Sequence, residues 1–204
     1  MKAFALPAAA LVALTAPTVG ATPSDSVRKP RDVSLELIGQ VTNTPPGVTP
    51  ATSTQVGYLP YVVGLKAFKG EPQNETTALF TFYAQLPTVR VVSHGPQRII
   101  TRLGKFTIYR DLSANSRFGA ADSFRDGRAV LVVSVRQQAL IDTISGTFTT
   151  LNRNTITAAK PFAAGARKVQ VGRVGEKFNT VLTGHLNMPG PPSGYFAGYT
   201  VAPR

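Results

Sequence analysis

The chain has 204 residues, no cysteine, no tryptophan and a formal net charge of +12 at pH 7. The lack of cysteine excludes disulfides, thiolate metal sites and thiol catalysis, and the length suits one domain with its own core. The positive charge favours anionic partners. Because the basic residues are dispersed rather than grouped with aromatics, they predict either charge for solubility or an anion-binding face, and no specific nucleic-acid recognition.

Residues 1–21 have the pattern of a cleavable secretory signal peptide. Lys2 supplies the positive start, residues 3–14 are apolar, and the segment ends on the small residues Gly20 and Ala21. The apolar run is shorter than the about 20 residues of a membrane anchor. We therefore expect a protein that is exported, to a bacterial periplasm or exterior rather than through a eukaryotic secretory pathway, with no membrane span after cleavage.

Residues 22–54 are expected to be a flexible N-terminal segment that contains one strand over residues 33–41. Apolar Val33, Leu35 and Leu37 alternate there with polar residues, as in a half-buried strand. Residues 42–54 are rich in proline and threonine and predict a loop. This loop is too short to separate two domains, so the first strand is expected to pair with the rest of the chain across it.

Residues 55–204 predict a single β domain, in which short strand-like runs alternate with glycine and proline turns. The expected strands are 56–68, 76–85, 88–93, 97–102, 105–110, 128–136, 139–144, 146–152, 168–171, 177–187 and 195–201. Residues 111–127 predict a long loop with one helical turn near residues 120–124. No segment keeps a helical period over three turns. The pattern therefore predicts an all-β fold, either an antiparallel β-barrel of about eight strands or a β-sandwich or jelly roll.

No catalytic residue, metal site or cofactor is predicted. The two histidines, His94 and His185, lie far apart in the sequence and show no metal-ligand spacing. No Gly-x-Ser-x-Gly nucleophile motif is present. Asp142 lies in an apolar strand-like run, where we expect it to form a structural ion pair rather than to act in catalysis.

Four residues in neighbouring predicted strands are candidates for a binding surface: Tyr83, Arg98, Tyr109 and Arg110. If these strands pair, tyrosine and arginine side chains could share a face or line a barrel lumen. The alternative is that all four are ordinary exposed strand residues.

Three functions fit the sequence. The first is a non-catalytic protein that binds a small apolar molecule or an anionic polymer of the cell envelope. The second is a small barrel enzyme, such as a cyclase or isomerase, and the third is a structural or adhesive envelope protein with residues 42–54 as a spacer. Buried polar groups converging inside the barrel would favour an enzyme, and a fully packed core would favour a structural protein. A cavity would favour ligand binding if it were lined by Phe80, Phe82, Phe106 and Phe148.

Overall fold

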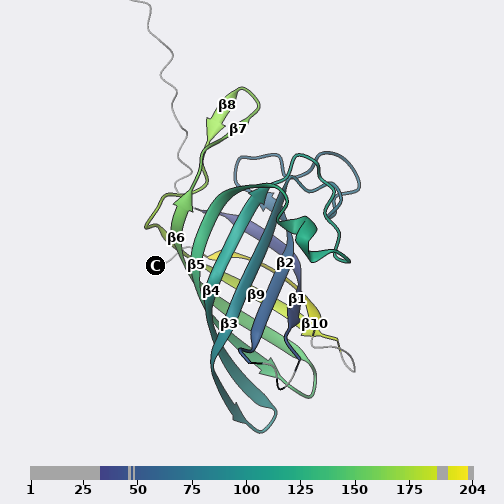
Figure 1. The fold of residues 1–204 in the computed structure, drawn as a ribbon, viewed down its shortest axis with the longest axis vertical. Helices are drawn as coiled ribbons and strands as arrows, with labels where there is room; N and C mark the ends of the chain where they lie inside the picture. The colour runs from purple at the N-terminus through teal and green to yellow at the C-terminus, as the bar shows by residue number, and fades with distance from the viewer. Residues whose placement is uncertain (1–32, 46, 48, 188–192, 202–204) are drawn as a thin grey trace, which may run out of the picture.

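Eight antiparallel strands close into a β-barrel in the computed structural model, which describes residues 33–45, 47, 49–187 and 193–201 (Figure 1). The barrel strands are β1 (Leu35–Asn43), β2 (Thr52–Val62), β3 (Phe80–His94), β4 (Gln97–Arg110), β5 (Arg128–Asp142), β6 (Thr147–Ala159), β9 (Lys177–Leu186) and β10 (Ser193–Val201). Around the barrel they follow the order β1-β10-β9-β6-β5-β4-β3-β2. The all-β prediction is confirmed, and of its two architectures the structure has the barrel. The predicted signal peptide lies outside the described residues.

Among the residues described, three short elements lie outside the barrel wall. β7 (Phe162–Ala164) and β8 (Arg167–Val169) form a separate two-stranded hairpin, so the strand expected over residues 168–171 does not join the barrel. The 3-10 helix η1 (Ala121–Phe124) is the helical turn expected in the long loop. None of the helices described is long and apolar enough to cross a membrane.

Strand β1 closes the barrel by pairing with β2 on one side and β10 on the other. Gly39 lies opposite both Gly57 and Phe196. The proline- and threonine-rich segment that predicted a loop contributes the end of β1 and the beginning of β2, where Thr42 pairs with Thr54. The expected N-terminal strand is thus a wall strand, paired with the rest of the chain across a short connection.

Several strands that the sequence predicted as separate are continuous. β3 passes through Pro87, which lies opposite Thr52 at the last pair between β2 and β3, where the missing proline N–H interrupts little of the ladder. β4 passes through Gly104, where an added Cβ would lie 2.1 Å from the carbonyl oxygen of Gln85. This glycine therefore marks a close approach of two strands rather than a turn.

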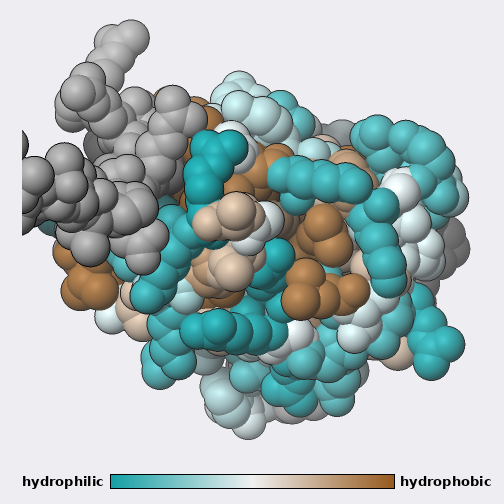
Figure 2. Space-filling view, turned by 90° about the horizontal axis from the view of Figure 1, so that it is seen from above, coloured by the Kyte–Doolittle hydropathy of each residue, from teal (hydrophilic) through white to brown (hydrophobic). Residues whose placement is uncertain are grey.

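The two ends of the barrel differ in their connections. The upper end in Figure 1, the long-loop end, carries residues 63–79, 111–127 and 160–176; the lower end, the short-turn end, carries the tight turns and the projecting β3–β4 hairpin. Buried apolar side chains fill the interior towards the long-loop end: Leu35, Leu59, Phe80, Ile108, Leu131, Ile156, Phe162 and Phe178. Figure 2 looks onto this end and shows brown apolar side chains near its centre with teal polar ones around them.

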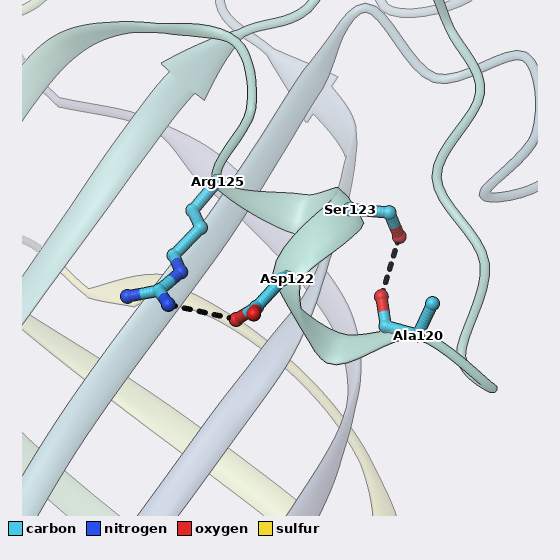
Figure 3. Close-up of polar contacts among 4 residues, drawn as sticks. All are labelled: Ala120, Asp122, Ser123 and Arg125. Atoms are coloured by element: carbon cyan, nitrogen blue, oxygen red, sulfur yellow. Dashed lines mark hydrogen bonds and ion pairs between the residues drawn. The ribbon is translucent and has the colours of Figure 1, made fainter.

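The loop that contains η1 packs on the outside of the barrel. Thr81 on β3 donates a hydrogen bond to the carbonyl oxygen of Phe124 at 2.9 Å, and the ring centroids of Phe118 and Phe124 are 5.0 Å apart. Within the turn, the Ser123 hydroxyl donates to the Ala120 carbonyl, and Arg125 forms an ion pair with Asp122 at 2.9 Å (Figure 3). These contacts fix the loop against the outside of the wall.

Candidate ligand site

A layer of buried polar side chains crosses the barrel between the apolar core and the short-turn end. We call it the polar belt; its members are Ser53, Gln55, Arg102, Gln137, Thr150, Asn152, Asn154 and Thr180. Strand alternation turns them inward, because they keep the phase of buried apolar neighbours on the same strands. Gln137, for example, lies between buried Val135 and Ala139, and Thr180 lies between buried Phe178 and Leu182.

A chain of hydrogen bonds runs through the belt from β4 to β9. Arg102 Nη1 donates to Gln137 Oε1 at 2.9 Å, and Gln137 Nε2 donates to Asn152 Oδ1 at 3.1 Å. Asn152 Nδ2 then donates to the Thr180 hydroxyl at 2.9 Å. On the other side Gln55 Nε2 donates to Gln137 Oε1 at 3.4 Å. Gln137 is fully buried and connects three partners, so it is the central residue of the belt.

Arg102 is the only charged side chain among the described residues of the belt. It is 6% exposed, and its Nη2 donates to Asn43 Oδ1 at 3.3 Å. Its partners are neutral amides, and its Nε has no hydrogen-bond partner. Burial lowers the pKa of the guanidinium to about 10, with no carboxylate nearby to raise it. The belt therefore holds a positive charge at neutral pH that no described side chain neutralises.

A small cavity of about 20 Å³ lies beside the guanidinium, on the side of the short-turn end. Its polar lining comes from Asn43, Gln55, Arg102, Gln137 and Thr150. The Thr150 hydroxyl, like Arg102 Nε, is buried without a partner. Two unsatisfied polar atoms in residues that line one cavity indicate a site for a polar group, because buried polar atoms are nearly always hydrogen-bonded.

The other linings of this cavity are apolar and lie towards the short-turn end. They include Val41, Ala139, Ile141, Phe148 and Leu186. A second cavity of about 10 Å³ lies on the core side of the belt, between Asn152 or Asn154 and the rings of Phe82 and Phe106. Each of these two cavities has room for about one water molecule.

The four binding candidates predicted from the sequence do not form one surface. Tyr83 and Tyr109 lie on the outer face of β3 and β4, where the Tyr83 ring lies 4.8 Å from the Arg125 guanidinium. Arg110 lies at the long-loop end, 5.0 Å from the Phe162 ring, and donates to the Ala163 carbonyl. Arg98 lies in the projecting hairpin, on the same strand face as Arg102.

The four phenylalanines whose shared cavity would favour ligand binding are divided among three places. Phe82 and Phe106 stack at 5.1 Å and line the smaller cavity, whereas Phe148 lines the larger one. Phe80 packs against Phe162 in the apolar core at 5.7 Å. Neither of these two cavities is lined by all four rings, whereas buried polar groups do converge inside the barrel.

The remaining titratable candidates lie outside the barrel interior. His94 and His185 are both exposed. Asp142 does not form the ion pair that we expected. Its Oδ1 accepts hydrogen bonds from the backbone of Ile144 and Ser145, which lower its pKa and fix the turn between β5 and β6. No cluster of metal-ligating side chains occurs among the residues described.

Comparison of the chain with family models, curated proteins and solved structures finds no match. The candidate site therefore rests on its own geometry.

Proposed function

We propose that this chain is a non-catalytic ligand-binding barrel whose site is the cavity beside Arg102, and that its ligand carries a small anionic group. The observation that carries the proposal is the buried guanidinium of Arg102, a residue that lines the cavity. It is held by neutral amides, and its Nε has no hydrogen-bond partner. An anion placed there would accept from Arg102 Nε and from the Thr150 hydroxyl, and it would supply the missing charge.

The energetics of the buried guanidinium support an anionic ligand. A lowering of the Arg102 pKa from 12.5 to about 10 corresponds to a cost of about 3 kcal/mol for keeping the charge buried at neutral pH. A bound anion would offset this cost, because a buried charge is tolerated when it is paired and hydrogen-bonded. A side chain that destabilises the empty protein and stabilises the complex is typical of a binding site.

Thermal unfolding in the presence of increasing acetate, chloride or phosphate tests the proposal. We expect at least one of these anions to raise the Tm of the wild-type protein in a saturable way, as a ligand of the folded state does. Arg102→Gln should abolish that rise. Arg136→Gln is the matched control, because Arg136 is exposed on the neighbouring strand and its loss changes the net charge equally. An equal response in all three proteins would overturn the proposal.

A second candidate function is binding of an anionic envelope polymer at the outer surface. It is favoured by the scarcity of ion pairs, since Arg125–Asp122 is the single one among the described residues despite the excess of basic side chains. Retention on immobilised heparin that weakens with salt would support it. Arg102→Gln should leave this retention nearly unchanged, because Arg102 is buried, whereas it should abolish binding inside the barrel.

The enzyme hypothesis has support from the polar belt, since the Arg102 guanidinium could stabilise an oxyanion of a substrate. The described residues of the belt include no carboxylate or imidazole to act as a general acid or base at neutral pH. This composition favours binding over catalysis.

A further inference from the structure

We infer that the ligand is an anionic amphiphile, with its head group beside Arg102 and its apolar chain directed out of the barrel along the inner face of the β3–β4 hairpin. The inference rests on the proposed function and adds the class of ligand and its orientation. It depends on three observations: the size of the cavity, the apolar surface at its mouth, and the projection of the hairpin.

The size of the cavity sets the orientation. The space beside the guanidinium is about 20 Å³, which is no more than the head group of a carboxylate needs. On the core side, stacked Phe82 and Phe106 fill the barrel and leave only about 10 Å³. A chain attached to the head group cannot extend into the core, so it must leave towards the short-turn end.

The mouth of the cavity offers an apolar path for such a chain. Ala139, Ile141 and Phe148 line the cavity on that side. The path continues outward because Ile100 lies opposite both Ala139 and Val91. One row across three strands is therefore formed by Val91, Ile100 and Ala139. The row lies on the same face as Arg102, which follows Ile100 by two residues on β4. We call this row, together with Ile141, the apolar shelf.

The outer part of the shelf, at Val91, is exposed because the hairpin projects beyond its neighbour, whereas Ala139 and Ile141 at its inner end are buried. β2 pairs with β3 only as far as Pro87, whereas β3 and β4 remain paired to His94 and Gln97 (Figure 1). Val91 is consequently 51% exposed. An apolar chain lying here would remove this surface from water, a favourable transfer of about 25 cal/mol per Å².

Arg98 adds a charge at the outer end of the shelf. It lies opposite Ile141 and shares the face of Ile100 and Arg102. Arg98 and Arg102 are four residues apart on an extended strand, a separation of about 13 Å. This distance is longer than a small ion and comparable with the length of a medium-length acyl chain. Exposed Arg98 gives the mouth a positive potential that attracts an anionic ligand.

Titration calorimetry tests the inference. The whole protein is titrated with acetate, octanoate and octyl glucoside, and the two amphiphiles are kept below their micellar concentrations. Octanoate should bind at least about tenfold more tightly than acetate, because it alone combines the anionic head with a chain that covers the shelf. Octyl glucoside, which has the chain and no charge, should bind far more weakly than octanoate.

Variants of the hairpin separate the shelf from the anion site. Val91→Thr and Ile100→Thr should each reduce the advantage of octanoate over acetate at least about threefold and leave acetate binding unchanged. Val92→Thr and Ile99→Thr are the matched controls, because they lie opposite each other on the outer face of the same hairpin. They should alter neither affinity.

The outcomes distinguish this inference from the proposed function. If acetate binds through Arg102 and octanoate binds no more tightly, the inference is wrong while the anion site stands. If Val91→Thr and Val92→Thr have equal effects on octanoate binding, the chain does not lie on the shelf. If no anion binds in a manner that depends on Arg102, the proposed function fails as well.

Discussion

Arg102 on β4 and Gln137 on β5 lie directly opposite each other inside the barrel, and Arg102 Nη1 donates a hydrogen bond to Gln137 Oε1 at 2.9 Å. This bond orients the guanidinium without neutralising it, because the amide carries no charge. The remaining Nε has no partner, and Arg102 lines a cavity. The pair therefore presents a fixed, buried cation to whatever enters from the short-turn end.

Replacing Arg102 by methionine should stabilise the protein in the absence of anions. The substitution removes an unpaired buried charge, and Gln137 Oε1 keeps a donor in Gln55 Nε2. We expect the free energy of unfolding in urea to rise by about 1–3 kcal/mol in a low-salt buffer with no added carboxylate or phosphate. Arg136→Met should change it by less than about 0.5 kcal/mol. A loss of stability in Arg102→Met would show that the belt needs the guanidinium as a structural donor.

The difference between wild type and Arg102→Met should shrink at high pH. The folded-state pKa of Arg102 is lowered to about 10, so below this pH both folded and unfolded chains are protonated and the cost of burial is fully present. Above it the unfolded chain binds more protons than the folded one, and stability rises relative to the variant. Urea unfolding of both proteins at pH 8 and pH 11 measures this change. A constant difference would contradict the lowered pKa.

Gln137→Leu should strongly destabilise the barrel. Gln137 is fully buried, and the change leaves Arg102 Nη1 and Asn152 Oδ1 without their partners. We expect a loss of about 2–5 kcal/mol in the free energy of unfolding, because each stranded polar atom costs about 1–3 kcal/mol. Gln138→Leu, on the outer face of the same strand, is the control and should cost little. Similar effects of the two variants would contradict the role of the belt.

Gly57→Ala should also be destabilising, for a steric reason. An added Cβ would lie 2.1 Å from the carbonyl oxygen of Ile38 and 2.7 Å from the ring of Phe82. Overpacking of a core typically costs about 1–3 kcal/mol, and here the neighbour is backbone that cannot rotate away. The Tm should fall by several degrees. Gly70→Ala, with no atom within 4 Å of the added Cβ, should leave the Tm nearly unchanged.

Export is tested at the N-terminus. The full chain produced in a bacterial host should be found outside the cytoplasm, and its sequence should begin at Thr22 if residues 1–21 are removed. Edman sequencing or intact mass of the recovered protein decides the matter. A recovered chain that retains residues 1–21 would contradict the predicted cleavage.

More of the fold than of the candidate site could be predicted from the sequence. Alternation with a period of two residues indicated strands along most of the chain, and the number of short strands indicated a barrel or sandwich. Alternation cannot show which of two faces is inside when both contain polar residues. In β6, Asn152 is buried in the belt whereas neighbouring Leu151 is 36% exposed, the reverse of the usual preference. The belt was missed for this reason.

Arg98 and Arg102 illustrate the same limit on one strand. Both lie on one face of β4 in similar local sequence, and the sequence predicts Arg98 as a binding candidate but not Arg102. Arg102 is buried and Arg98 is exposed because they lie at different distances from the end of the barrel. The position of that end depends on how far β2 pairs along β3. Such non-local register is not visible in a strand's own residues.

The pairing of β1 with β10 has a consequence for the order in which the chain folds. The amide of Leu35 donates to the Thr200 hydroxyl across 165 positions of sequence, so the wall cannot close until the last strand is present. Until then β1 and β9 both present open edges, which are prone to pair with other chains. Contacts this distant in sequence also slow folding. A growing chain of this protein therefore remains an open sheet until residues 193–201 are available, and removal of those residues should produce aggregates rather than a smaller barrel.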